Sequence, residues 1–150
     1  MQRGTFCPGL SAKDTSLRLQ RDRALFETYT RALQERHFAS QGEAIDYVRR
    51  HQAPRFYIDG NFCAIIIGRM LKGKPTGLKG KQRERKFQEL YRLFLIERAK
   101  PENKGLPKRE ICSRIVEMPA PEFYLNYRAT NGIITEQSKL RMKEMERWTK

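Results

Sequence analysis

The sequence contains two copies of one segment, and this duplication constrains the fold more than any other feature. Residues 20–23 read Gln-Arg-Asp-Arg and residues 82–85 read Gln-Arg-Glu-Arg. After an insertion of five residues in the second copy, the match resumes in the blocks Ala-Pro-Arg-Phe-Tyr-Ile at 53–58 and Ala-Pro-Glu-Phe-Tyr-Leu at 120–125. A bias toward Arg and Glu explains the first block but not the second. The chain therefore repeats one supersecondary unit over about 20–72 and 82–140.

Two helices are predicted at the start of each copy. Apolar or aromatic residues recur at positions 25, 29 and 33 and again at 87, 91 and 95, which is the spacing of one helix face. For the second helix, Ser40 and Glu43 form a capping box in the first copy. In the second copy, Pro107 suits a first helical turn.

The Ala-Pro-x-Phe-Tyr block predicts a break and then a third helix. Proline disfavours a helical conformation in the residue before it, so the second helices end close to 52 and 119 and the Phe-Tyr pairs are extended. Asp59 and Asn126 follow, and both are strong N-cap residues, so third helices are expected from Gly60 to about 71 and from Tyr127 to about 148. Asp-Gly at 59–60 also suits a β-hairpin turn, but Asn-Tyr at 126–127 does not, which favours helices in both copies.

These elements predict an all-α fold with two copies of a three-helix, helix-turn-helix-like unit. A flexible N-terminal arm is expected at 1–16, the first repeat at 17–72 and the second at 82–150, ending in a C-terminal helix. Between them, residues 73–81 are rich in Lys and Gly and contain Pro75, so they form a basic linker.

The charge of the chain indicates a polyanionic partner. The formal net charge is +14 and the pI is near 10.1, which costs self-repulsion in the folded state unless a nucleic acid or an acidic surface offsets it. A membrane surface is less favoured because the basic residues are spread through the chain. No apolar run is long enough to span a bilayer and no signal peptide is evident, so we expect a cytoplasmic protein.

The cysteines indicate neither a disulfide framework nor a zinc site. The chain has three, Cys7, Cys63 and Cys112, without a Cys-x-x-Cys pair and without histidines at ligand spacing. Cys63 and Cys112 have apolar neighbours and are expected to be small core residues. Unpaired thiols are consistent with a reducing cytoplasm.

The layout of helix, helix, short turn and helix, present twice, resembles that of Myb-like and homeodomain-like repeat proteins. The Ala-Pro-Arg-Phe-Tyr block is also similar to small basic bacterial proteins associated with mobile elements. The chain departs from both patterns: Trp148 is its only tryptophan, and the invariant asparagine of homeodomains has no assignable counterpart. The resemblance implies DNA binding by a transcriptional regulator or a mobile-element accessory factor, associated with the bacterial nucleoid.

Candidate nucleic-acid contacts follow from charge and from position in the predicted helices. Tandem modules on a linker gain affinity through effective concentration, with double-stranded DNA favoured over RNA. The candidates for phosphate contact are Arg21, Arg23, Lys72, Lys74, Lys79, Lys81, Arg83 and Arg85. The candidates for base contact are Arg55, Asn61, Tyr127, Arg128 and Asn131. For each basic residue the alternative is a solvated surface charge, and for Asn61 and Asn131 it is local turn or capping chemistry.

Two other functions stay open at this point. The Phe-Tyr pairs at 56–57 and 123–124 would stack on single-stranded RNA if exposed, or pack in the core. The C-terminal helix, with Leu140, Met142, Met145 and Trp148, would serve a protein-interaction module. Catalysis is not expected, because the sequence has no Gly-rich phosphate loop, no Ser/His/Asp set and no Arg/His cluster around Tyr57 or Tyr124. No metal or cofactor is expected.

Overall fold

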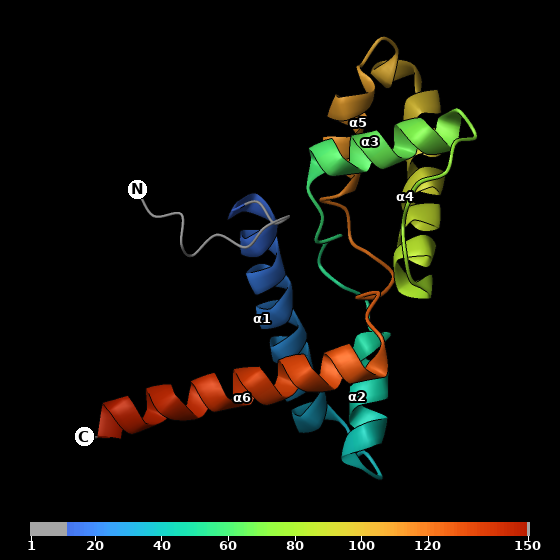
Figure 1. Ribbon diagram of the computed structural model, residues 1–150. Helices are drawn as coiled ribbons and strands as arrows, with labels where there is room; N and C mark the ends of the chain where they lie inside the picture. Colours follow the sequence, from blue (N-terminus) through green and yellow to red (C-terminus); the bar gives the residue numbers. More distant parts are fainter. Residues whose placement is uncertain (1–11, 150) are drawn as a thin grey trace. The chain divides into compact units, whose positions relative to one another are not determined.

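The structure, a computed structural model, describes residues 12–149. Within this range it contains α-helices and one 3-10 turn but no strand, so the expected all-α class is confirmed (Figure 1). The elements are α1 (Ala12–Glu35), α2 (Gln41–Arg49), α3 (Gly60–Leu71), α4 (Lys81–Ala99), η1 (Pro101–Asn103), α5 (Lys108–Ile115) and α6 (Tyr127–Thr149). None of the described helices is long and apolar enough to cross a membrane.

The third helix of each copy begins at the predicted cap. A side-chain oxygen of Asp59 accepts a hydrogen bond from the Phe62 N–H at 3.2 Å, and Asn126 Oδ1 accepts one from the Ala129 N–H at 2.7 Å. These bonds satisfy N–H groups that have no partner within the helix. The hairpin alternative at 59–60 is therefore wrong, because α3 starts at Gly60.

Helix α2 begins at the expected cap, but both second helices end earlier than expected. Ser40 Oγ accepts a hydrogen bond from the Glu43 N–H at 3.1 Å, which is the capping interaction predicted for α2. Helix α2 ends at Arg49 and α5 at Ile115, before the expected ends near 52 and 119, and Pro107 is the residue that precedes α5.

Two local expectations differ from the structure. Helix α1 begins at Ala12, inside the segment 1–16 that was expected to be a flexible arm, and residues 1–11 lie outside the described range. Tyr124 has φ of 57° instead of the expected extended conformation. A left-handed backbone brings Cβ close to the following carbonyl oxygen, at a cost of roughly 1–2 kcal/mol for an L-residue.

The described chain forms two compact units, and they do not coincide with the two copies in the sequence. One unit holds residues 12–18 and 54–120, with the start of α1 and all of α3, α4, η1 and α5. The other holds 19–53 and 121–149, with most of α1, all of α2, and α6. The third helix of each copy thus packs with helices of the other copy: α3 against α4 and α5, and α6 against α2 (Figure 1). The expected tandem units at 17–72 and 82–150 are not confirmed.

The Ala-Pro-x-Phe-Tyr blocks make this exchange reciprocal. The Phe56 N–H donates to the carbonyl oxygen of Val116, just after α5, at 2.9 Å. The Phe123 N–H donates to the carbonyl oxygen of Arg49, at the end of α2, at 3.3 Å. Both pairs, 56 with 123 and 49 with 116, are related by the same shift of 67 residues. Because the two copies present equivalent helix ends, an extended, proline-containing connection carries each third helix to the other copy's partners.

Each unit has its own apolar core. In the first unit the core is built by side chains from α3, α4 and α5 together with Phe56: Phe56, Cys63, Ile67, Phe87, Leu90, Phe94, Ile111, Cys112 and Ile115. In the second it is built by α1, α2 and α6 together with Phe123: Leu25, Tyr29, Ile45, Val48, Phe123, Thr130 and Ile134. The core assignment of the two phenylalanines and of both cysteines is therefore confirmed.

We predict that Asp59→Ala and Asn126→Ala each lower the free energy of unfolding by about 1 kcal/mol, because each leaves a helix N–H without its acceptor. Urea denaturation followed by circular dichroism measures the change. Asp59→Asn and Asn126→Asp are the controls, since both keep a side-chain acceptor, and they should unfold close to wild type. Equal losses in the alanine variants and the controls would show that the caps contribute nothing.

Candidate nucleic-acid interface

The positive charge of the chain is concentrated in one of the two units. Residues 54–120 contain sixteen Lys and Arg against seven Asp and Glu, so they carry +9 of the total +14. The other unit, residues 19–53 and 121–150, contains twelve Lys and Arg against nine Asp and Glu, a net charge of +3, and residues 1–18 carry the remaining +2. The unit that contains α3, α4 and α5 is therefore the more positively charged of the two.

Within that unit, residues 72–86 form what we call the basic segment, which joins α3 to the first turns of α4. It contains seven Lys or Arg residues and one acidic residue, Glu84. Six of the seven are exposed: Lys72, Lys74, Lys79, Lys81, Arg83 and Arg85. All six were predicted phosphate contacts, and all six side chains are exposed on this one stretch of chain.

The backbone of the basic segment is held by local hydrogen bonds. The Lys74 N–H donates to the Arg69 carbonyl oxygen at 2.9 Å, and the Arg69 guanidinium donates to the Thr76 carbonyl oxygen at 3.2 Å. The segment turns at Gly73, Gly77 and Gly80, whose φ values of 69°, 76° and 98° favour glycine. Helix α4 begins immediately afterwards, so the positive end of its dipole lies among these cations.

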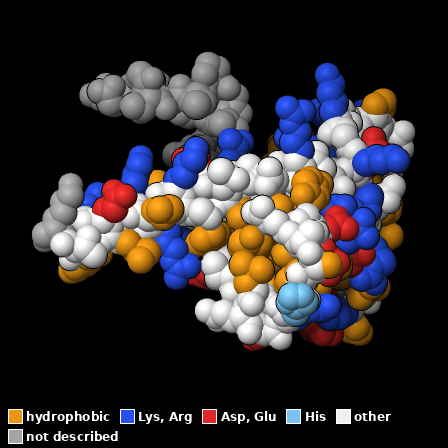
Figure 2. Space-filling model, turned by 90° about the horizontal axis from the view of Figure 1, so that it is seen from below, with side chains coloured by type: hydrophobic (Ala, Val, Ile, Leu, Met, Phe, Trp, Pro, Cys, Tyr) orange, Lys and Arg blue, Asp and Glu red, His pale blue; other side chains and the backbone are white. Residues whose placement is uncertain are grey.

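Exposed cations are visible on the space-filling surface, where Lys and Arg side chains project from the molecule and hydrophobic side chains also reach the solvent (Figure 2). In the unit that contains residues 54–120, α5 adds three exposed cations that were not among the predicted contacts: Lys108, Arg109 and Arg114. The Lys108 ammonium lies beside Gly68, close to where the basic segment begins. No sequence signal places Lys108 there, because the packing of α3 on α5 is decided only in the tertiary structure.

The remaining predicted contacts in this unit have different surroundings. Arg55 is half-buried, and its Nε donates to the Phe56 carbonyl oxygen at 3.0 Å, so its guanidinium is engaged with the backbone of the Ala-Pro block. Asn61 is exposed in the first turn of α3. Helix α3 itself is largely a core helix, because five of its 12 residues are buried and Arg69 is its only basic residue.

Five predicted contacts lie in the other unit. Arg21 is half-buried and paired with Asp22 at 2.9 Å, whereas Arg23 is exposed. Tyr127, Arg128 and Asn131 are exposed in the first turns of α6, and the Tyr127 hydroxyl lies against Gly42 of α2. The structure thus divides the thirteen candidates between the two units instead of repeating one set in each.

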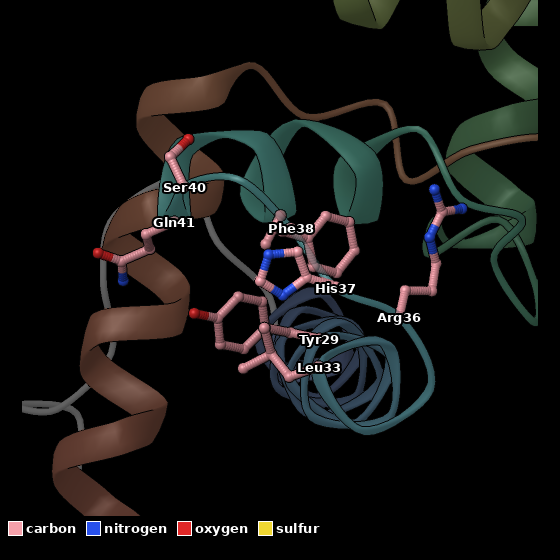
Figure 3. A pocket seen from close by; sticks show the side chains of 8 residues that line it. Tyr29, Leu33, Arg36, His37, Phe38, Ser40 and Gln41 are labelled. Carbon is pink, nitrogen blue, oxygen red and sulfur yellow. The ribbon is translucent and has the colours of Figure 1, made fainter.

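A pocket of about 420 Å³ lies between the end of α1 and the start of α2 (Figure 3). Tyr29, Leu33, Arg36, His37 and Phe38 are among the side chains around it. The Arg36 guanidinium lies over the rings of Phe38 and Tyr47, 5.4 Å and 4.3 Å from their centroids. Among the described residues, no group of three or more His, Cys, Asp or Glu is arranged to hold a metal ion.

No protein-family model, no curated protein and no solved structure matches this chain. Its function is therefore inferred from the charge, burial and contacts of the described residues.

We predict that replacing Lys72, Lys74, Lys79 and Lys81 together by Gln leaves the melting temperature unchanged or slightly raised. These side chains are exposed and crowded with like charge, so their removal relieves repulsion without opening the core.

Arg49→Gln is the contrast, because Arg49 is paired with Asp46 at 2.7 Å and donates to the Leu125 carbonyl oxygen at 3.3 Å. We expect it to lower the free energy of unfolding by about 1–2 kcal/mol. Differential scanning calorimetry checks both, and a large loss in the lysine variant would contradict the assignment.

Proposed function

We propose that this protein binds double-stranded DNA, and that the basic segment at 72–86 provides the main phosphate contacts. The observation that carries the proposal is the gathering of +9 of the net +14 in the unit that contains this segment. Cations fixed on a structured surface release counterions from DNA on binding, which gives affinity without sequence recognition.

The burial of Phe56 and Phe123 favours binding of double-stranded DNA over binding of single-stranded RNA. Stacking on unpaired bases needs exposed aromatic faces, and Phe56 and Phe123 are only 1% and 6% exposed. Their Tyr57 and Tyr124 neighbours are half-buried, which leaves the RNA alternative without two of its four stacking rings.

Each unit contains predicted base contacts of its own. We propose that Asn61 in one unit and Arg128 and Asn131 in the other contact base edges, while the basic segment sets the affinity. The units are not equivalent: the counterpart of Arg55 in the second copy is Glu122, which is buried and acidic. A strong and a weak module in one chain suit a transcriptional regulator or a mobile-element accessory factor, the roles that the helix-turn-helix resemblance also implies.

We predict that fluorescence anisotropy detects binding of a random-sequence duplex that weakens steeply with salt. In the quadruple variant with Lys72, Lys74, Lys79 and Lys81 changed to Gln, the slope of log K against log salt should fall by up to about 3.6, that is about 0.9 for each lost phosphate contact. The matched control replaces Arg31, Lys139, Lys143 and Arg147 by Gln, which removes the same charge from exposed positions of the other unit. In this control variant, the slope of log K against log salt should fall much less than in the lysine variant.

Three outcomes would contradict this assignment. Equal losses in the two quadruple variants would mean that affinity follows net charge and not the basic segment. Tighter binding to a matched single strand than to duplex would favour the RNA alternative. Absence of binding at low salt would favour a protein partner for α6, where Met142, Met145 and Trp148 are 62%, 60% and 85% exposed.

A further inference from the structure

In the unit that contains the basic segment, α3 of the first copy packs on α5 of the second. A Cβ atom built on Gly60 would lie 3.1 Å from the Ser113 Cα, so the first turn of α3 touches the backbone of α5. Further along, Gly68 lies against the Lys108 side chain. Since contacts advance along α3 from 60 to 68 while they recede along α5 from 113 to 108, the two helices run in opposite directions.

Two cysteines meet in the middle of this contact. Cys63 lies one turn after Gly60 on α3, and Cys112 lies next to Ser113 on α5. Both side chains have 0% exposure, and the two thiols share a hydrogen bond. Both are free thiols in this structure. Glycine at 60 lets the backbones approach closely, which is what a disulfide requires, because its two Cα atoms must come within about 7 Å.

We infer that Cys63 and Cys112 form a disulfide site, in which oxidation by a small-molecule disulfide covalently joins α3 of the first copy to α5 of the second. The Cys112 thiolate attacks a sulfur of the reagent, forming a mixed disulfide and releasing one thiol. The Cys63 thiolate then attacks the Cys112 sulfur and releases the second thiol. The protein loses two protons and two electrons, and the reagent is reduced to two thiols.

The surroundings of the two thiols support this order of attack. The hydrogen bond from Cys63 lowers the pKa of Cys112, and the positive charge of Lys108, one turn earlier on α5, acts in the same direction. The same hydrogen bond and burial raise the pKa of Cys63. The thiolate is the attacking form, so Cys112 is the first nucleophile. Because both groups are covered, reaction requires α3 to open transiently from α5.

The other unit supplies a matched pair of residues that cannot be oxidised in this way. A shift of 67 residues relates Cys63 to Thr130 and Cys112 to Ile45, and these two are also buried, with 0% and 1% exposure. The double variant Cys63→Thr/Cys112→Ile therefore imports side chains that already fill the equivalent core. It is the control for the disulfide, and Cys7→Ser is the background in which the pair is tested alone.

The test uses the full chain carrying Cys7→Ser, treated with hydroxyethyl disulfide and followed by intact-mass spectrometry. We expect a monomeric product 2 Da lighter than the reduced chain. Trypsin should link the peptide 56–69 to the peptide 110–114 in that product. The closed loop spans about 50 residues, and we expect the oxidised form to melt about 10 °C higher than the reduced form. The Thr/Ile control should remain folded, with no mass loss and no shift in melting temperature.

Two results would overturn the inference. One is a chain that keeps both thiols after prolonged treatment, or that accumulates only mixed disulfides with the reagent. The other is a disulfide that forms but lowers the melting temperature, which would mean that the native packing of α3 on α5 does not accommodate the bond. If the Thr/Ile control fails to fold, the single variants Cys63→Ala and Cys112→Ala serve in its place, and a loss of 2 Da in either would count against the site.

Discussion

The hydrogen bond from the Phe56 N–H to the Val116 carbonyl oxygen, with its counterpart from Phe123 to Arg49, fixes how this chain is assembled. Each bond satisfies a carbonyl group near the end of a second helix, and each comes from the connection that leads to the other copy's third helix. Proline in both connections keeps the backbone extended at this point. The third helices are therefore exchanged, and neither copy completes a core from its own three helices.

The exchange has an electrostatic consequence. Helix α3 belongs to the first copy, yet it packs with α4 and α5 of the second, and the basic segment that follows α3 leads directly into α4. The cations of the segment are thus combined with those of α4 and α5 in one unit. Residues 54–120 therefore carry a net charge of +9, whereas residues 19–53 and 121–150 carry +3.

Duplication has been followed by divergence in the residues that matter for chemistry. Equivalent core positions hold Cys63 and Thr130, which are both fully buried but differ in redox behaviour. Equivalent positions in the Ala-Pro blocks hold Arg55, whose Nε donates to a backbone carbonyl, and Glu122, which is buried. The shared scaffold comes from the residues that the copies retain, while the differences give each unit its own surface.

The sequence by itself determined the duplication, the helical class and most helix boundaries. These depend on local chemistry: Asp59 and Asn126 accept hydrogen bonds from N–H groups three residues ahead, and the prolines at 54 and 121 act on the residues beside them. The six exposed cations of the basic segment were also predicted from sequence, because the charge of a side chain can be read without knowing the fold. Their neighbour Lys108 was not, since that contact joins residues forty positions apart. Only the tertiary structure decided that α3 packs with α4 and α5 of the second copy and that α6 packs with α2 of the first. Two copies with equivalent apolar faces make either pairing compatible with the local pattern, so the choice rests on long-range packing and on the path of the extended connections.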